Sequence, residues 1–172
     1  MPTVSFTDQA LTDEERAFPP LINEADAARV LVVGWFSFEE VVATIGDVLA
    51  SQVACRWLQE HDYAHDLALA PFMDGDGVDW RTVDPARYSH LVFVCGPVHD
   101  DPLIHALLQR FGGCRSVALA VSVTEKDSGH LFDVVLERDS ATAARPDLSF
   151  AAPTRRVPVV GLALAPPQPE YG

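Results

Sequence analysis

Residues 29–60 read RVLVVGWFSFEEVVATIGDVLASQVACRWLQE, and this stretch decides the fold. Four consecutive branched apolar residues, 30–33, end at Gly34, a pattern typical of a buried parallel strand. A loop over 35–45 follows, and Gly46 and Asp47 then open a helical run. Strand, loop and helix in this order form the first half of a βαβ unit. Because ligands of such units bind beyond the carboxyl end of the strand and near the helix N-terminus, we expect one wall of a site here.

Further apolar runs predict strands along the rest of the chain, at 67–70, 91–96, 116–123, 134–136 and 157–164. A second helix is predicted to begin at Asp101 and Pro102, because Asp is a good N-cap and Pro fits the first helical position. Helices that alternate with apolar strands indicate an α/β fold, a three-layer, Rossmann-like parallel sheet with helices on both faces. We expect this domain to span 29–164, between an acidic N-terminal extension (1–28) and a Pro-rich tail (165–172).

The composition narrows the compartment and the class of partner. The chain has 172 residues, 48% of them hydrophobic, which is enough for one domain with a core and excludes disorder of the whole. Its net charge of −13 argues against nucleic acid and against anionic membrane surfaces as partners. No apolar run approaches the roughly 20 residues of a membrane span. We therefore expect a soluble protein of the cytoplasm.

The common nucleotide and metal signatures are missing. Bulky residues follow Gly34, so G-x-G-x-x-G is absent, and the chain's one lysine, Lys126, belongs to no P-loop. G-x-S-x-G is absent too. The acidic turn at 74–77 lacks the spacing and the distal glutamate of a calcium loop. Three widely spaced cysteines fit buried, inert thiols better than a zinc or redox site: Cys55, Cys95 and Cys114. We expect no cofactor and no metal.

The candidate site residues are those that follow the predicted strands, since these strand ends meet at one edge of a parallel sheet. They are Trp35, Ser37, Gly46, Asp47, His99, Asp100, Ser122, Thr124, Glu125, Arg138, Asp139 and Ser140. His99 beside Asp100 fits an oriented general base or, more simply, a solvated histidine in a polar loop. Arg138 beside Asp139 fits a grip for a carboxylate or phosphate or, more simply, a local ion pair.

In their order and spacing, these stretches resemble the N-terminal part of the polysaccharide pyruvyl transferase family. The family's opening strand, aromatic loop and Gly-Asp helix start are matched by 30–36 and by Gly46-Asp47. Further matches follow in the family's order: the strand and turn at 92–97, the strand end at 121–123, the Arg-Asp-Ser element at 138–140 and the Val-Gly-Leu strand at 159–162. The resemblance covers about residues 29–164.

The resemblance implies the Rossmann half of a GT-B-like transferase. Such an enzyme moves a pyruvyl group from phosphoenolpyruvate to a sugar acceptor and forms a ketal, once a second half completes the site. It implies catalytic roles for His99 and Arg138, and ligand contacts from Trp35, Ser37, Gly46, Asp47, Asp100, Ser122, Asp139 and Ser140. The alternative is a non-catalytic ligand-binding or interaction domain, whose acidic face or N-terminal extension meets a protein partner or a second copy.

Overall fold

The computed structural model describes residues 29–41, 43–123, 130–139 and 144–152. Over these residues the chain forms a six-stranded sheet with two α-helices and short 3-10 helices. The strands are β1 (Arg29–Val33), β2 (His65–Leu67), β3 (Tyr88–Val94), β4 (Pro97–Val98), β5 (Arg115–Val123) and β6 (Val134–Asp139). The helices are η1 (Trp35–Ser37), α2 (Ile45–Glu60), η2 (Pro85–Arg87), α3 (Pro102–Arg110) and η4 (Leu148–Ala151). Both terminal extensions and the predicted strand at 157–164 lie outside the described residues.

All pairings between these strands are parallel. β1 lies between β2 and β3, and β5 lies between β3 and β6. β3 pairs with the first half of β5, and the short β4 pairs with the last two residues of β5. β4 therefore extends β3 along the side of β5 opposite to β6. The chain therefore runs from β1 to β2 on one side and later reaches β3 on the other. The gap between β1 and β3 is thus the topological switch point, where open α/β sheets bind ligands at the carboxyl end.

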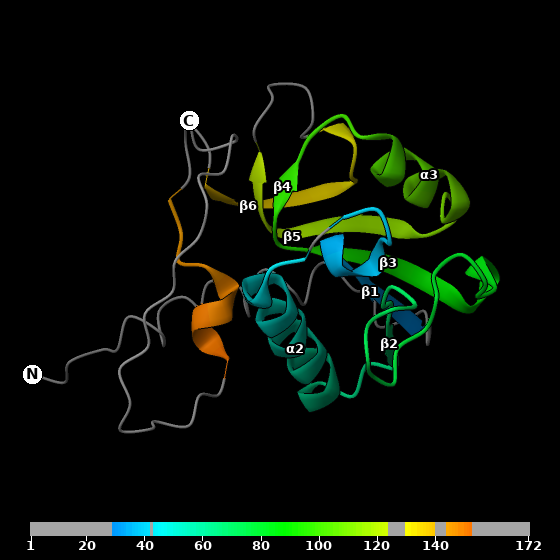
Figure 1. The fold of residues 1–172 in the computed structure, drawn as a ribbon, viewed down its shortest axis with the longest axis horizontal. Helices are drawn as coiled ribbons and strands as arrows, with labels where there is room; N and C mark the ends of the chain where they lie inside the picture. Colours follow the sequence, from blue (N-terminus) through cyan, green and yellow to red (C-terminus); the bar gives the residue numbers. More distant parts are fainter. Residues whose placement is uncertain (1–28, 42, 124–129, 140–143, 153–172) are drawn as a thin grey trace, which may run out of the picture.

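Helices cover both faces of the sheet (Figure 1). Alternate residues of a strand point to opposite faces, so β1 divides its apolar side chains between two cores. Val30 and Val32 pack with α2, and η4 joins this layer through Leu148. Leu31 and Val33 belong to the core that α3 covers. We call these sides the α2 face and the α3 face. The predicted three-layer α/β sheet with helices on both faces is confirmed.

Both α-helices begin with the side-chain caps that satisfy their first backbone N–H groups. Thr44 caps α2 and forms a capping box with Asp47, whose carboxylate accepts a hydrogen bond from the Thr44 backbone N–H at 3.0 Å. Asp101 caps α3 by accepting from the Leu103 N–H at 2.7 Å, with Pro102 at the first helical position, as predicted. Within the part of the chain that the structure describes, no helix is long and apolar enough to cross a membrane.

The second strand lies earlier than the predicted 67–70, because β2 ends at Leu67. The chain then turns toward η1: the Ala68 carbonyl accepts from the Ser37 hydroxyl at 2.7 Å, and the Ala70 N–H donates to the Phe36 carbonyl at 3.0 Å. Both alanines are buried, so this apolar run marks a buried loop, two of whose backbone groups are satisfied by η1. Other boundaries also move: β3 begins three residues before the predicted 91–96 strand, and β6 extends to Asp139.

Candidate functional site

Trp35 fills the crevice at the switch point between β1 and β3. Its side chain is 6% exposed, and its ring meets Phe93 of β3 edge-on, with the ring centres 5.8 Å apart. The indole N–H donates to the Pro97 carbonyl at 3.0 Å. Gly96 makes this position possible, because a Cβ there would lie 2.7 Å from the indole Nε1. Trp35 therefore occupies the crevice in which ligands of this sheet order bind.

His99 stacks on this indole. The imidazole stacks on Trp35 with ring centres 5.7 Å apart and an angle of 18° between the planes. Its Nε2 is 3.4 Å from a carboxylate oxygen of Asp101, while Asp100 pairs with His105. The carboxylate that accompanies His99 is thus the α3 cap, two residues along the chain, instead of the adjacent Asp100. The ring remains partly exposed, so a bound molecule can reach it.

Ser37, Gly46 and Asp47 hold backbone in place. The Ser37 side chain is buried and accepts from the Gly34 N–H at 3.1 Å while it donates to Ala68. Asp47 belongs to the α2 capping box and accepts from the Thr44 hydroxyl at 2.8 Å. Gly46 lies in the first turn of that helix. These residues lie near the carboxyl edge, as expected, and their observed contacts shape the loop that follows β1.

Arg138 forms the charged centre of the edge, on the α2 face. Its side chain is 15% exposed; one Nη donates to the Ser122 hydroxyl at 2.6 Å, and the other pairs with the Asp147 carboxylate. Asp139 lies 3.4 Å away. We call these residues the Arg138 cluster. Burial lowers the pKa of the guanidinium, but the carboxylates of Asp147 and Asp139 outweigh it, so that the pKa is raised and the charge is kept.

The structure brings four of the predicted site residues together as two pairs, and it separates the two pairs from each other. Ser122 and Arg138 come from different strands and meet directly. Trp35 and His99 also meet, but Trp35 belongs to the α3 face, whereas the strand neighbour of Arg138, Leu136, packs on the α2 face. The predicted residues Thr124, Glu125 and Ser140 lie outside the described residues. The candidate site is therefore two groups at one edge, on opposite faces of the sheet.

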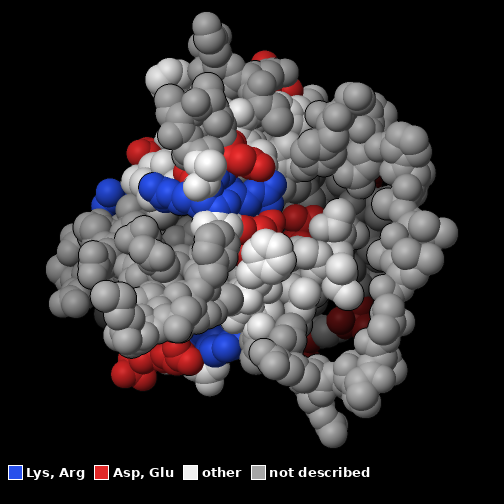
Figure 2. Space-filling model, turned by 90° about the vertical axis from the view of Figure 1, so that its left-hand side faces the viewer, with Lys and Arg blue, Asp and Glu red and all other residues white. Residues whose placement is uncertain are grey.

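Sequence reasoning missed Asp147, the strongest partner of Arg138. Its position is fixed by η4, which it caps by accepting from the Ser149 N–H at 2.8 Å. The sequence carries a signal for that cap, since Asp147 follows Pro146 and precedes an apolar turn. The sequence does not predict its contact with Arg138 of β6, because that contact depends on how η4 packs against α2. Figure 2 views this side of the molecule and shows basic side chains lying directly against acidic ones.

Two core residues at this edge have a left-handed backbone, which is rare outside glycine. Cys95 directly follows β3 and has a φ of 59°, and Ala120 lies in β5 with a φ of 53°. The register of β5 with β6 shifts between Leu119 and Val121, which places Ala120 at a β-bulge, and shifts again between Val121 and Ser122. Both residues are buried. Backbone of this kind is held by its surroundings and clusters at functional sites, and here both residues lie in the strands that end at the candidate edge or directly after them.

We expect Ala120→Gly to leave the free energy of unfolding nearly unchanged. Glycine relieves a left-handed strain of about 1 kcal/mol, which offsets the lost methyl group and the added chain entropy. Ala118 is the matched control, since it is buried in the same strand and has no positive φ. Ala118→Gly is expected to cost about 1–2 kcal/mol. Urea melts of both variants measure the difference, and equal losses would contradict a strained Ala120.

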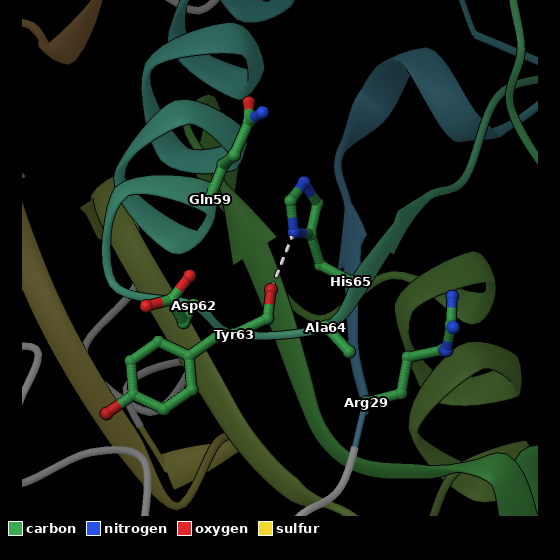
Figure 3. A pocket seen from close by; sticks show the side chains of 6 residues that line it. All are labelled: Arg29, Gln59, Asp62, Tyr63, Ala64 and His65. Atoms are coloured by element: carbon green, nitrogen blue, oxygen red, sulfur yellow. Dashed lines mark hydrogen bonds between the residues drawn. The ribbon is translucent and has the colours of Figure 1, made fainter.

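A polar depression of about 540 Å³ lies at the opposite, amino edge of the sheet (Figure 3). It is lined by Arg29, Gln59, Asp62, Tyr63, Ala64 and His65. Two of its polar side chains are already engaged: Arg29 pairs with Asp66 at 2.6 Å, and Nδ1 of His65 lies 3.0 Å from the Tyr63 carbonyl. In Figure 3 the side chains point apart and converge on no common point. We therefore keep the candidate site at the carboxyl edge.

Comparison with protein-family models gives no match to this sequence, and a search of curated proteins finds no similar sequence.

Proposed function

We propose that this chain is a polysaccharide pyruvyl transferase-like domain, which transfers a pyruvyl group from phosphoenolpyruvate to a sugar when a second half completes the site. The observation that carries the proposal is the contact between Ser122 and Arg138. They belong to two of the stretches that resemble the family, and they meet at the carboxyl edge around a largely buried cation. Two other such stretches, at Trp35 and at Gly96, also pack together at this edge. The proposed compartment is the cytoplasm.

The reaction needs an anion grip and a proton acceptor. Two sugar hydroxyl oxygens bond to C2 of phosphoenolpyruvate, the bond from C2 to the phosphate oxygen breaks, and the methylene carbon takes a proton to become the ketal methyl group. The hydroxyls release two protons, one for that carbon and one for the departing phosphate. Arg138 suits the grip, because guanidinium groups bind carboxylates and phosphates with paired hydrogen bonds. His99, partly exposed and oriented by Asp101, suits proton transfer.

The test is a product assay on the protein as its complete gene encodes it. Phosphoenolpyruvate labelled at its methylene carbon is incubated with a panel of sugar acceptors, and NMR follows the ketal methyl signal alongside phosphate release. We expect acceptor-dependent ketal formation, which Arg138→Gln abolishes. Arg115→Gln is the control, because Arg115 lies at the amino end of β5 and is exposed. Absence of ketal with every acceptor, from a protein that keeps its folded sheet, would overturn the proposal.

A second candidate function is a non-catalytic ligand-binding or interaction domain. It is favoured by the observation that Arg138 and His99 already contact carboxylates of the chain, and by two exposed apolar side chains. Ile45, at the start of α2, is 81% exposed, and Phe150 of η4 is 69% exposed. Light scattering of the complete protein, alone and with candidate partners, tests this function. A monomer under all conditions, whose mass no partner changes, would count against it.

A further inference from the structure

We infer that Arg138 is a binding site for a ligand carboxylate or phosphate, that the Asp147 side chain occupies this site in the absence of ligand, and that the ligand binds by displacing Asp147. The identity of the natural ligand rests on the proposed function, whereas the site follows from the contacts of Arg138. One Nη of the guanidinium points to Ser122 and the other to Asp147. A carboxylate on a guanidinium is the arrangement by which arginine binds a ligand's anionic group. Here the chain itself supplies that carboxylate.

The charges of the cluster make Asp147 and an incoming anion exclude one another. Arg138 contributes one positive charge, and Asp139 and Asp147 contribute two negative charges, so the cluster is negative while both carboxylates stay. The side chains of Arg138 and Asp147 are 15% and 28% exposed, so water screens the repulsion between Asp147 and an incoming anion less than it would at an open surface. An incoming anion would be the third negative group on one cation, so it can bind only after one carboxylate leaves. Asp147 is the one to leave, because it occupies the Nη1 donor that a ligand would use.

Arg138 is held in place by several contacts, whereas Asp147 precedes a short 3-10 helix, η4. β6 pairs with β5 on both sides of Arg138, the Ser122 hydroxyl accepts from the guanidinium, and the Arg138 carbonyl accepts from the Arg145 N–H at 2.7 Å. Asp147 instead caps η4, which rests on α2 through Leu148. A single-turn helix has few internal hydrogen bonds to lose when it moves. Ligand binding is therefore expected to shift η4 while the sheet stays in place.

Asp147→Asn is the central variant. Asparagine keeps the size of the side chain and the cap on η4, because Asn is as good an N-cap as Asp, but it removes the competing charge. Asp139→Asn is the matched control: it removes the same charge from the same guanidinium, at a longer distance of 3.4 Å and from a more exposed side chain. The double variant Arg138→Gln/Asp147→Asn removes the proposed site. Circular dichroism confirms that each variant folds.

The experiment titrates the full chain and each variant with inorganic phosphate and, separately, with pyruvate, by NMR. We expect Asp147→Asn to bind at least one of them about tenfold more tightly than the wild type, equivalent to about 1.4 kcal/mol. Phosphate alone, pyruvate alone, or both will show which part of a ligand the site takes. The gain for Asp139→Asn should be clearly smaller, and the double variant should lose it. In the wild type, saturating ligand should speed hydrogen exchange at Ser149 and Ala152.

Three results would each overturn the inference. Equal gains for Asp139→Asn and Asp147→Asn would show a general charge effect, and a gain that persists in the double variant would place the anion elsewhere. Unchanged affinity in Asp147→Asn would show that Asp147 blocks nothing. These outcomes are separate from the product assay, because binding of phosphate or pyruvate needs no turnover. Tighter binding without ketal would keep the site and reject the transferase, and ketal formation with unchanged affinity would do the reverse.

Discussion

Gly96→Ala is expected to lower the free energy of unfolding by about 2–5 kcal/mol. Gly96 has a φ of +77°, a conformation that costs alanine about 1–2 kcal/mol. The new methyl group would also press on the Trp35 indole, 2.7 Å from Nε1, and this ring is buried against Phe93 and cannot move freely. Overpacking of this kind adds about 1–3 kcal/mol. Chemical denaturation followed by tryptophan fluorescence measures the total.

Gly113→Ala is the control for the general effect of adding a methyl group. Gly113 has no positive φ, and a Cβ there would meet nothing within 4 Å. Its substitution should stabilise the protein slightly, by no more than about 1 kcal/mol, through the entropy of the unfolded chain. In a Trp35→Ala background the cost of Gly96→Ala should shrink toward the backbone strain alone. A Gly96 variant as stable as the Gly113 variant would show that the indole does not lie against this glycine.

The architecture was predictable wherever local rules agree with the tertiary structure. The four consecutive branched apolar side chains of β1 predict a strand that is buried on both faces, and the structure confirms this prediction. The Asp101-Pro102 start of α3 was predictable because its cap uses only neighbouring backbone. β4 was not predictable, since Pro97 and Val98 form a strand only because the end of β5 lies beside them.

The candidate site could be predicted as an edge but not as a set of contacts. The residues that follow the strands could be named as candidates, because the carboxyl ends of parallel strands lie at one edge of the sheet. Which residues touch depends on the pleat of the strands and on tertiary packing. The pleat places Trp35 and Arg138 on opposite faces of the sheet, and the packing of η4 brings Asp147 to Arg138. The expected pairing of His99 with Asp100 followed from adjacency in the sequence. The backbone instead turns Asp100 toward His105.

Trp35→Ala is expected to cost about 3–5 kcal/mol, the usual range for removing a buried aromatic side chain. The ring packs against Phe38 and Phe93, stacks with His99 and donates its N–H to the Pro97 carbonyl. The substitution leaves a cavity at the switch point, and an apolar cavity of this size accepts a small aromatic molecule. Thermal melts should therefore show a large loss that added indole partly restores. At a free indole concentration ten times its Kd, about 1.4 kcal/mol should return.

Trp35→Phe separates the loss of the ring from the opening of the crevice. Phenylalanine fills most of the space, so this variant should lose less stability than the alanine variant and should gain nothing from indole. Rescue of Trp35→Ala alone would locate the cavity, because the two variants share every other part of the molecule. A loss below about 1 kcal/mol, the range of surface substitutions, would mean that Trp35 swings clear of the crevice. The ring would then be a lid that a ligand can displace, and the switch point would join Arg138 as a candidate binding region.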